Sequence, residues 1–444
     1  MPPASRSTAS TTDPRAAKRS TLSSRSSSPM LEDGVRLLPV DDDSWRLEAY
    51  LRRGGYGTAR KVLTTMAPVD VIAEVCKAVL RGRGGAGFPA GVKWGFVPKG
   101  GAGPKYLCVN ADEAEPGTFK DRLILLRAPH QLIEGMLITA FAVGIRSAFI
   151  YVRGEYARVA RRLEEAIAEA RAAGFVGPRV FGTDLGLDVV VHHGAGAYIC
   201  GEETALLESL EGRRGQPRVK PPFPAVVGLF RSPTVINNVE TIATVPQILA
   251  NGAEWFLGRG LAKDGGTRLY SVSGAVRRPG AYELAVGTPL REIIDVHAGG
   301  APEGQSIKAV IPGGLSAPVL MPGELDVAMD VDSLFRAGSM LGSAGIIVIP
   351  EGTAMLDVLH ATARFYAHES CGKCTPCRIG TAWILKVVER LRSAGGGPAD
   401  LDLILRLAAG IKGRTLCPLG DAAALPIHAL VTKFRSELER AVAR

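Results

Sequence analysis

The chain has 444 residues, of which 46% are hydrophobic and 22% charged, enough apolar surface for two or three ordinary domain cores. Its net charge is +9, and the first 29 residues supply +4 of this through five basic residues against one acid. No nucleic-acid-binding motif or basic stripe is present, which disfavours that class of protein. The most apolar stretch, 133–152, is interrupted by Glu134 and Arg146, so no transmembrane helix is expected.

The first 29 residues are rich in Ser, Thr, Arg and Pro and show no apolar periodicity. Three interpretations are open: a disordered tail, an organelle transit peptide, or translation from an upstream start codon with Met30 as the initiator. Because an amphipathic apolar face is missing, disorder or a misplaced start is favoured over targeting. We therefore predict a disordered tail over residues 1–34.

Short apolar runs alternate with helical patterns between residues 45 and 255. Apolar positions at three- and four-residue spacing between Tyr156 and Ala170 predict a helix, and Gly174 follows as a stop signal. Strands are expected at 106–109, 148–152 and 189–191, and further helices at 132–145 and from 202 to 210. This alternation predicts an α/β domain with a largely parallel sheet over residues 35–258.

The pattern changes twice in the second half of the chain. Between 262 and 345, short apolar runs are separated by Gly/Pro turns such as Pro279-Gly280, which predicts a small β-rich domain over 259–347. From residue 351, helical patterns recur through 356–366, 379–391, 401–407 and 422–442. Four helices with a cysteine loop between the first two predict a bundle over 348–444.

The cysteines of this last region are the most informative motif. Cys371, Cys374 and Cys377 stand at two-residue spacing, and Cys417-Pro418 follows forty residues later. A C-x2-C-x2-C loop can ligate three corners of a cubane cluster, and a distant Cys supplies the fourth. Structural zinc prefers two separated Cys pairs or Cys with His, and disulfides need an oxidising compartment. The pattern therefore favours a [4Fe-4S] cluster and electron transfer.

A glycine-rich loop at residues 82–89 reads GRGGAGFP and contains the spacing G-x-G-x-x-G. Alone this is a weak signal, because the usual dinucleotide fingerprint follows a strand, whereas residues 71–80 look helical here. An ordinary Rossmann nucleotide loop is therefore not expected. The loop still suits a flat cofactor lying against the glycine backbone, with Phe88 and Phe96 available to stack on it.

Four further segments offer groups to a nucleotide or flavin, and each has an ordinary structural alternative. Residues 110–117 follow a predicted strand end, where α/β proteins bind ligands, but also suit a solvated acidic turn. Glu202 and Glu203 either complement a helix dipole or accept hydrogen bonds from a ribose, which would favour NADH over NADPH. Residues 220–224 are a linker or a ligand contact. Residues 236–241 bind a phosphate or cap a helix.

In succession these segments closely resemble the NADH-binding flavoprotein subunit of respiratory complex I, over roughly residues 35–440. The matching motifs are GRGGAGFPAGVKW, NADEAEPGTFKDR, GAYICGEETALLESLEGRRGQPR, KPPFPA, TVINNVET, ESCGKCTPCRIG and CPLGDAA. The resemblance implies non-covalently bound FMN, one [4Fe-4S] cluster and NADH as the substrate. The implied fold is a Rossmann-like FMN/NADH domain, a small ubiquitin-like β-grasp domain and a C-terminal four-helix bundle that carries the cluster. Phe119 and Ile236 are minor departures from the family pattern.

The resemblance also implies the site residues. FMN would be surrounded by Gly82, Arg83, Gly84, Lys93, Asn110, Asp112, Glu113, Tyr198, Gly201, Glu202, Asn237, Asn238 and Thr241. NADH would be contacted by Phe88, Phe96, Glu115, Glu203, Lys220 and Phe223. The cluster would be ligated by Cys371, Cys374, Cys377 and Cys417.

The implied activity is that of the NADH dehydrogenase, or electron-input, subunit. Hydride would pass from NADH to FMN, and single electrons would then pass to the cluster and onward towards quinone, with no catalytic protein nucleophile. The expected partners are a small [2Fe-2S] subunit and a large iron–sulfur subunit. The expected location is cytoplasmic, peripheral to the inner membrane through the complex and without direct insertion.

Two other classes of function remain as alternatives. The closer one is the diaphorase subunit of a soluble NAD-dependent formate dehydrogenase or hydrogenase, which shares these motifs but often carries an extra module that a leader of about 35 residues is too short to hold. The other is a non-catalytic iron–sulfur scaffold, which predicts loss of the flavin loops. All of those loops are present in this sequence.

Overall fold

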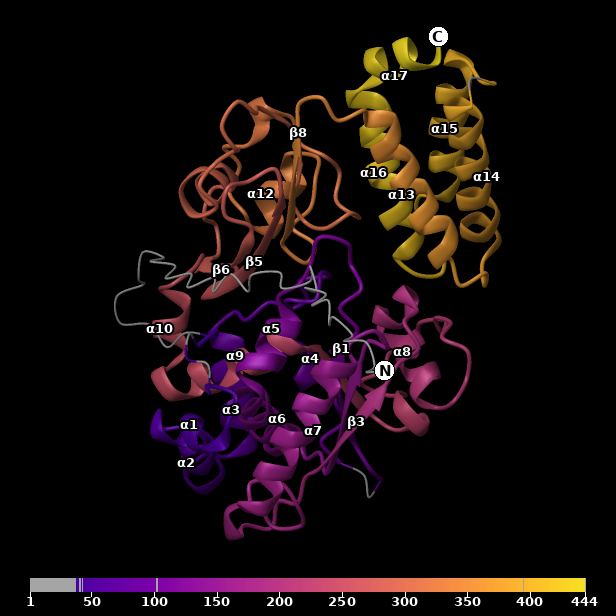
Figure 1. The fold of residues 1–444 in the computed structure, drawn as a ribbon. Coiled ribbons are helices and arrows are strands. Elements are labelled where there is room, and N and C mark those ends of the chain that lie inside the picture. The colour runs from indigo at the N-terminus through magenta and orange to yellow at the C-terminus, as the bar shows by residue number, and fades with distance from the viewer. Residues whose placement is uncertain (1–36, 40, 42, 101–102, 394, 444) are drawn as a thin grey trace, which may run out of the picture. The chain divides into compact units, whose positions relative to one another are not determined.

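The computed structural model describes residues 37–443 apart from 40, 42, 101–102 and 394. The predicted tail, residues 1–34, lies outside the described residues. From residue 35 onwards the chain forms one unit, in which an α/β region, a β-rich region and a helical region follow one another along the sequence (Figure 1).

The α/β region is built on a parallel sheet of four strands in the order β3-β2-β1-β4. The strands are β1 (Tyr106–Ala111), β2 (Ser147–Val152), β3 (Asp188–His193) and β4 (Thr234–Asn238). The predicted parallel sheet is confirmed, and each of its three predicted strands is present. β4 is an addition to the prediction, because Asn237 and Asn238 at its end hide the apolar strand pattern.

Successive residues of β1 face opposite sides of the sheet, as strand geometry requires. Leu107, Val109 and Ala111 pack into the largest apolar core, whereas Cys108 belongs to a smaller core. The helices that contribute to the larger core are α1 (Leu47–Arg52), α2 (Gly57–Thr65), α3 (Pro68–Lys77), α4 (Ala90–Gly95), α5 (Asp121–Arg127), α6 (Pro129–Val143), α7 (Ala157–Ala172), α9 (Val239–Asn251) and α10 (Ala253–Leu257). The smaller core includes the short turn η2 (Tyr198–Gly201) and α8 (Glu203–Leu210).

The β-rich region contains a mixed four-stranded sheet in the order β6-β5-β8-β7. β5 pairs with β6 antiparallel and with β8 parallel, and β7 pairs with β8 antiparallel. The strands are β5 (Thr267–Gly274), β6 (Gly280–Ala285), β7 (Ile307–Ile311) and β8 (Gly345–Pro350), and the helices are α11 (Leu290–Glu292), η4 (Ile293–His297), η5 (Pro322–Glu324) and α12 (Val331–Arg336). The sheet agrees with the predicted β-rich domain.

The C-terminal region is helical, as predicted. α13 and α15 each pack against both α14 and α16 around a shared apolar core. The helices are α13 (Met355–Glu369), α14 (Thr375–Arg392), α15 (Pro398–Ile411), α16 (Leu419–Lys433) and α17 (Arg435–Val442). The single predicted pattern over 422–442 is two helices, because the buried Phe434 leaves helical geometry and ends α16. Within the described ranges, no helix combines the length and the apolar character needed to cross a bilayer.

Candidate functional site

The glycine-rich loop lies between α3 and α4 and is closed on itself. The Gly82 backbone N–H donates to the Phe88 carbonyl at 2.9 Å, and Arg81 and Pro89 form an antiparallel bridge at the base. A side chain at Gly84 would bring its Cβ to 3.1 Å from the Asn238 Cβ, so glycine lets the loop lie directly on the end of β4. The loop therefore stands at the carboxyl edge of the parallel sheet, where α/β proteins bind ligands.

The acidic segment after β1, residues 110–117, joins this edge to a second glycine-rich turn, residues 194–201. The Asn110 side-chain amide donates to the Gly201 carbonyl at 2.9 Å, and the Asn110 side-chain oxygen accepts from the Asp112 N–H at 3.1 Å. The Asp112 carboxyl is buried, and burial raises its pKa to about 7. Its Oδ2 atom has no hydrogen-bond partner in the described part of the chain. A buried acceptor without a donor is the kind of group that a ligand hydroxyl satisfies, so the residues here fit a polyhydroxylated chain such as that of FMN.

Glu113, which follows Asp112, has its oxygens occupied by the protein. One accepts from the Asp121 N–H at 2.7 Å, and the other accepts from the Arg122 N–H and the Tyr156 hydroxyl at 3.2 and 3.1 Å. Burial raises the pKa of this carboxyl, and the nearby Asp121 raises it further. Glu113 therefore caps the start of α5 and ties it to the site.

Two lysines and two glutamates form a half-buried charge cluster beside the second turn. Lys220 Nζ lies 3.0 Å from Glu202 Oε1 and 2.8 Å from Glu203 Oε1, and Lys93 Nζ lies 3.1 Å from Glu203 Oε2. Glu202 also caps α8, because its side chain accepts hydrogen bonds from the Thr204 and Ala205 N–H groups. The interpretation of Glu202 as a residue that complements the start of a helix is thereby confirmed. The two lysines retain about a quarter of their exposure and stand within reach of an anionic ligand.

Exposed aromatic rings flank the glycine loop. Phe88 is 44% exposed and Phe96 58% exposed, and their ring centroids are 6.0 Å apart. Val92, one turn from each, is also exposed. Phe223, on the segment 220–224, is exposed as well. Large apolar rings left in solvent commonly mark a binding surface, and a pair of rings suits a flat aromatic ligand.

Glu115 connects several segments that are far apart in sequence. Its Oε2 accepts from the Tyr198 hydroxyl at 2.6 Å, and its Oε1 accepts from the Ser316 N–H at 2.8 Å. The Tyr198 backbone N–H in turn donates to Glu369 at the end of α13 at 3.0 Å. The acidic segment, the second turn, the β-rich region and the cysteine-bearing region thus meet at Glu115 and Tyr198.

The four predicted cluster cysteines share one apolar core. Cys371 and Cys374 lie in the loop between α13 and α14, Cys377 lies in the first turn of α14, and Cys417 precedes α16. Burial raises the pKa of Cys377, and the neighbouring Cys374 and Cys371 raise it further. All four are free thiols, and burial raises the pKa of Cys417 to about 12.

This donor set fits a cubane cluster, which four thiolates hold on four separate irons. In the part of the chain that the structure describes, no three His, Cys, Asp or Glu side chains are grouped so as to hold one metal ion. The same apolar core contains Ile199 and Cys200 of η2. The cysteine loop and the turn that carries Tyr198 and Gly201 therefore border the same core, and the hydrogen bond from the Tyr198 N–H to Glu369 joins them at the end of α13.

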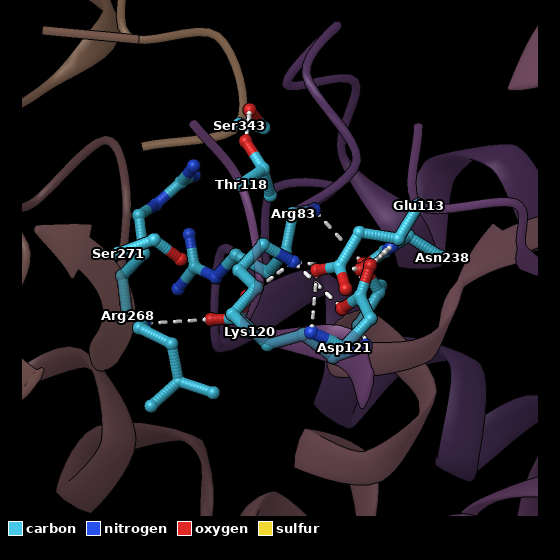
Figure 2. Close-up of polar contacts among 12 residues, drawn as sticks. Arg83, Glu113, Thr118, Lys120, Asp121, Asn238, Arg268, Ser271 and Ser343 are labelled. Carbon is cyan, nitrogen blue, oxygen red and sulfur yellow. Dashed lines mark hydrogen bonds and ion pairs between the residues drawn. The ribbon is translucent and has the colours of Figure 1, made fainter. Parts of the chain in front are cut away.

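A network of buried charges adjoins Asn238 at the end of β4 (Figure 2). Lys120, only 1% exposed, places its Nζ 2.8 Å from Asp121 Oδ1 and 2.7 Å from Glu240 Oε2. The Asn238 amide donates to Asp121 Oδ2 at 2.6 Å, and its oxygen caps α9 by accepting from the Glu240 N–H. The capping interpretation of Asn238 is thereby confirmed. In the sequence, Lys120 and Asp121 stand in the motif NADEAEPGTFKDR and Asn238 and Glu240 stand in TVINNVET, but neither motif indicates that these charges are buried together.

The remaining predicted flavin contacts also have partners in the protein. Asn237 Oδ1 accepts from the buried Trp94 indole N–H at 2.9 Å, and Thr241 Oγ1 accepts from the Arg83 N–H at 2.9 Å. The Arg83 guanidinium is fully buried and pairs with Asp264 at 2.6 Å. These side chains shape the edge of the sheet, and the groups that stay open to a ligand are the glycine backbone, Asp112, the lysines and the exposed rings.

A ligand-binding edge of a parallel sheet, four cysteines on one core and a pair of exposed aromatic rings fit the class of FMN- and iron–sulfur-binding NADH dehydrogenases, and the family models place the chain in that class. Three family models match the chain: the Nuo51 FMN-binding domain over residues 75–247, the SLBB domain over 268–348, and the NADH-ubiquinone oxidoreductase-F iron-sulfur binding region over 357–441. The predicted β-rich region is therefore an SLBB domain.

Named relatives specify the family. The chain is 54% identical over 404 residues to the second F-type subunit of NADH-quinone oxidoreductase from Rhizobium meliloti, covering 91% of this chain and 96% of the relative. It is 51% identical over 399 residues to the F-type subunit of NADH-quinone oxidoreductase from Streptomyces coelicolor, covering 90% and 88%. The chain belongs to the family of F-type subunits of NADH-quinone oxidoreductases.

A solved structure supports the same fold. An NAD+-reducing [NiFe]-hydrogenase in the H2-reduced state matches with a TM-score of 0.80 at 36% identity, over 89% of this chain. The match covers 66% of the hydrogenase chain, so the present chain spans just under two thirds of that length.

Proposed function

We propose that the chain oxidises NADH at a bound FMN and delivers the electrons one at a time to a [4Fe-4S] cluster, as the electron-input subunit of complex I. The observation that carries this proposal is the apolar core shared by the four cysteines and η2. It brings the thiolate set against the turn at the flavin edge, and electron transfer between two centres needs such proximity. FMN supplies hydride acceptance and one-electron release, and the cluster supplies one-electron acceptance.

The residues at the sheet edge would hold FMN. The buried Asp112 Oδ2 is free to accept a hydrogen bond from the flavin's side chain, and the Gly82–Gly84 backbone allows close approach of the ligand. Lys93 provides a cation close to the end of β4, since it donates to the Ile236 carbonyl at 3.1 Å. Asn110, Glu113, Asn237, Asn238 and Thr241 would keep this edge in shape through the hydrogen bonds given above.

NADH would bind on the exposed side of the glycine loop. Phe88 and Phe96 offer their faces to a flat base, and Phe223 stands exposed on the segment that carries Lys220. The carboxylates of Glu202 and Glu203 would repel a 2′-phosphate, so NADH is preferred over NADPH. Glu115 and Tyr198 would lie where the two ligands meet.

The domain extents are proposed to follow the sequence prediction. These are a Rossmann-like FMN/NADH domain over 35–258, a ubiquitin-like β-grasp domain over 259–347 and a four-helix bundle over 348–444, with α17 as an addition to the bundle. The partners are proposed to be a small [2Fe-2S] subunit and a large iron–sulfur subunit, and the location the cytoplasmic face of the inner membrane through that complex. Family membership at 54% identity supports this assembly.

The diaphorase subunit of a soluble NAD-dependent enzyme is the second candidate, and the hydrogenase match favours it. The higher identity to the F-type relatives favours complex I. Co-expression with the two proposed partner subunits separates these functions. A stable three-subunit complex that reduces ferricyanide with NADH supports the complex I assignment. NADH oxidation by the chain with no association between the subunits contradicts it.

A further inference from the structure

The two arginines of the glycine loop are both held by one short segment that precedes and begins β5. Arg81 Nε donates to the Lys263 carbonyl at 2.9 Å. The Arg83 guanidinium donates to Asp264 Oδ1 at 2.6 Å, to the Gly265 carbonyl at 2.8 Å and to the Thr267 carbonyl at 3.0 Å. We call residues 263–268 the anchor segment. It lies about 180 residues from the loop in sequence, as these four bonds show.

The backbone of the anchor segment approaches its neighbours closely. A Cβ added to Gly265 would lie 2.3 Å from the Ala78 carbonyl oxygen, and one added to Gly266 would lie 2.1 Å from the Phe256 ring. The Gly265 N–H also donates to the Val79 carbonyl. The segment is therefore closely packed against the end of α3 and against α10.

The charges of the anchor depend on one carboxylate. The Arg83 and Arg268 side chains are 0% and 1% exposed, and both face Asp264, whose side chain is 5% exposed. Arg268 Nη2 lies 3.7 Å from Asp264 Oδ2, and the positive charge of Arg83 also acts on Arg268. Arg83 Nε, Arg268 Nε, Arg268 Nη2 and Asp264 Oδ2 have no hydrogen-bond partner among the described residues. Two buried cations thus share Asp264, with Glu240 as a more distant counter-charge.

The anchor is continuous with the flavin edge. The backbone N–H of Arg83 donates to Thr241 on α9, and the next residue, Gly84, packs on Asn238. Fixing the Arg83 guanidinium therefore fixes the backbone of the loop at the point where it meets the end of β4. A shift of the loop by about 1 Å would move its N–H groups out of range of a ligand.

We propose that Asp264 is a positioning residue that holds the glycine loop in its FMN-binding form and that Arg268 weakens this hold by competing for the same carboxylate, so that FMN affinity is set in part from the segment that leads into the SLBB region. This rests on the proposed function for the identity of the ligand. No sequence motif contains either residue. Both act through Arg83, and the specific balance of two cations against one carboxylate distinguishes this role from a general contribution to stability.

The test uses Asp264→Asn, Arg268→Gln and the double variant in the full-length chain. Hydrogen exchange of the peptide covering residues 82–88 is measured without FMN, and FMN affinity is measured by quenching of flavin fluorescence on titration. Asp326→Asn is the matched control, because Asp326 also pairs with an arginine of the same region, Arg291, but is 73% exposed.

Asp264→Asn is expected to speed exchange in the loop and to weaken FMN binding on the order of tenfold. The double variant is expected to recover part of both losses, because removal of Arg268 relieves the repulsion between the two arginines. Asp326→Asn is expected to match the unmodified chain. Unchanged exchange and affinity in Asp264→Asn would overturn the inference, as would a double variant worse than the sum of the single changes.

The outcomes separate this inference from the proposed function. If the unmodified chain binds no FMN, the proposed function fails, and the exchange data still decide whether Asp264 holds the loop. If Asp264→Asn does not fold, Arg268→Gln tests the same arrangement, since it leaves the Arg83–Asp264 pair intact. It is then expected to slow loop exchange or leave it unchanged, and faster exchange would contradict the role of Asp264 as the shared counter-charge.

Discussion

Lys120 is the cation on which the buried network behind the flavin edge depends. Its ammonium group is 1% exposed and lies within 2.8 Å of carboxylate oxygens of Asp121 and Glu240, which are 6% and 1% exposed. Replacement by Met keeps most of the apolar stem but leaves two buried carboxylates without their cation. Breaking a buried pair in this way costs about 3–5 kcal/mol of unfolding free energy.

The assay is urea or thermal denaturation of the cofactor-free chain, followed by circular dichroism. The control is Lys77→Met, since Lys77 pairs with Glu254 at a similar distance but both are largely exposed, and no measurable change is expected there. The reasoning is refuted if Lys120→Met loses no more stability than Lys77→Met.

The loss in Lys120→Met should also depend on pH in a definite direction. Burial raises the pKa of Asp121, and Lys120 opposes that rise. Without Lys120 the folded-state pKa moves further above the unfolded value, so the destabilisation is fullest at alkaline pH and is relieved as the pH falls and the carboxyl protonates. A loss that is equal at pH 8 and pH 5 would contradict this account of the network.

The site itself carries three more predictions, one for each of its ligands. Burial raises the Asp112 pKa to about 7, so the ligand-free chain loses stability as the pH rises from about 4 to 7. The unfolding free energy of Asp112→Asn should therefore rise relative to the unmodified chain by up to about 4 kcal/mol across that range. A difference in thermal midpoint that stays constant with pH would contradict this. Phe88→Ala should raise KM for NADH about tenfold with little change in thermal midpoint, because an exposed stacking ring contributes about 1–3 kcal/mol per base; an unchanged KM removes Phe88 from the NADH site. Cys417→Ser should abolish the [4Fe-4S] EPR signal while FMN still binds, and a full-strength signal would exclude Cys417 as a ligand.

The regular parts of the fold were accessible from the sequence because they follow local periodicity. The helix over 157–172 and the strand over 147–152 have the apolar spacing that their geometry demands. β4 was not accessible from the sequence, since its five residues end in the polar pair Asn237-Asn238, which was interpreted as part of a ligand-binding motif. Likewise the pattern over 422–442 gave no signal for the break at Phe434, which is set by packing against the other helices rather than by a Gly or Pro.

In the candidate site, too, the residues with a local sequence signal could be predicted and those set by long-range contacts could not. The cysteine spacing predicted a thiolate set, and the structure brings those four residues to one core: a short loop holds Cys371 and Cys374 next to Cys377, whereas the packing of α14, α15 and α16 returns Cys417 to them. Buried charges such as Lys120 and Arg268 were not predictable, because a charged residue in a sequence is normally solvent-exposed. Burial of Lys120 depends on neutralisation by Glu240, which lies about 120 residues later in the chain. Contacts of that range have no local signal.

Anaerobic titration of the reconstituted chain with NADH, and separately with NADPH, tests the central claim most directly. Flavin absorbance and cluster EPR are followed together in the same samples. The account predicts bleaching of the flavin by NADH, a much weaker response to NADPH, and the appearance of a reduced [4Fe-4S] signal. A chain that binds iron but no FMN, or whose flavin does not respond to NADH, would contradict the electron-input function and leave an iron–sulfur scaffold.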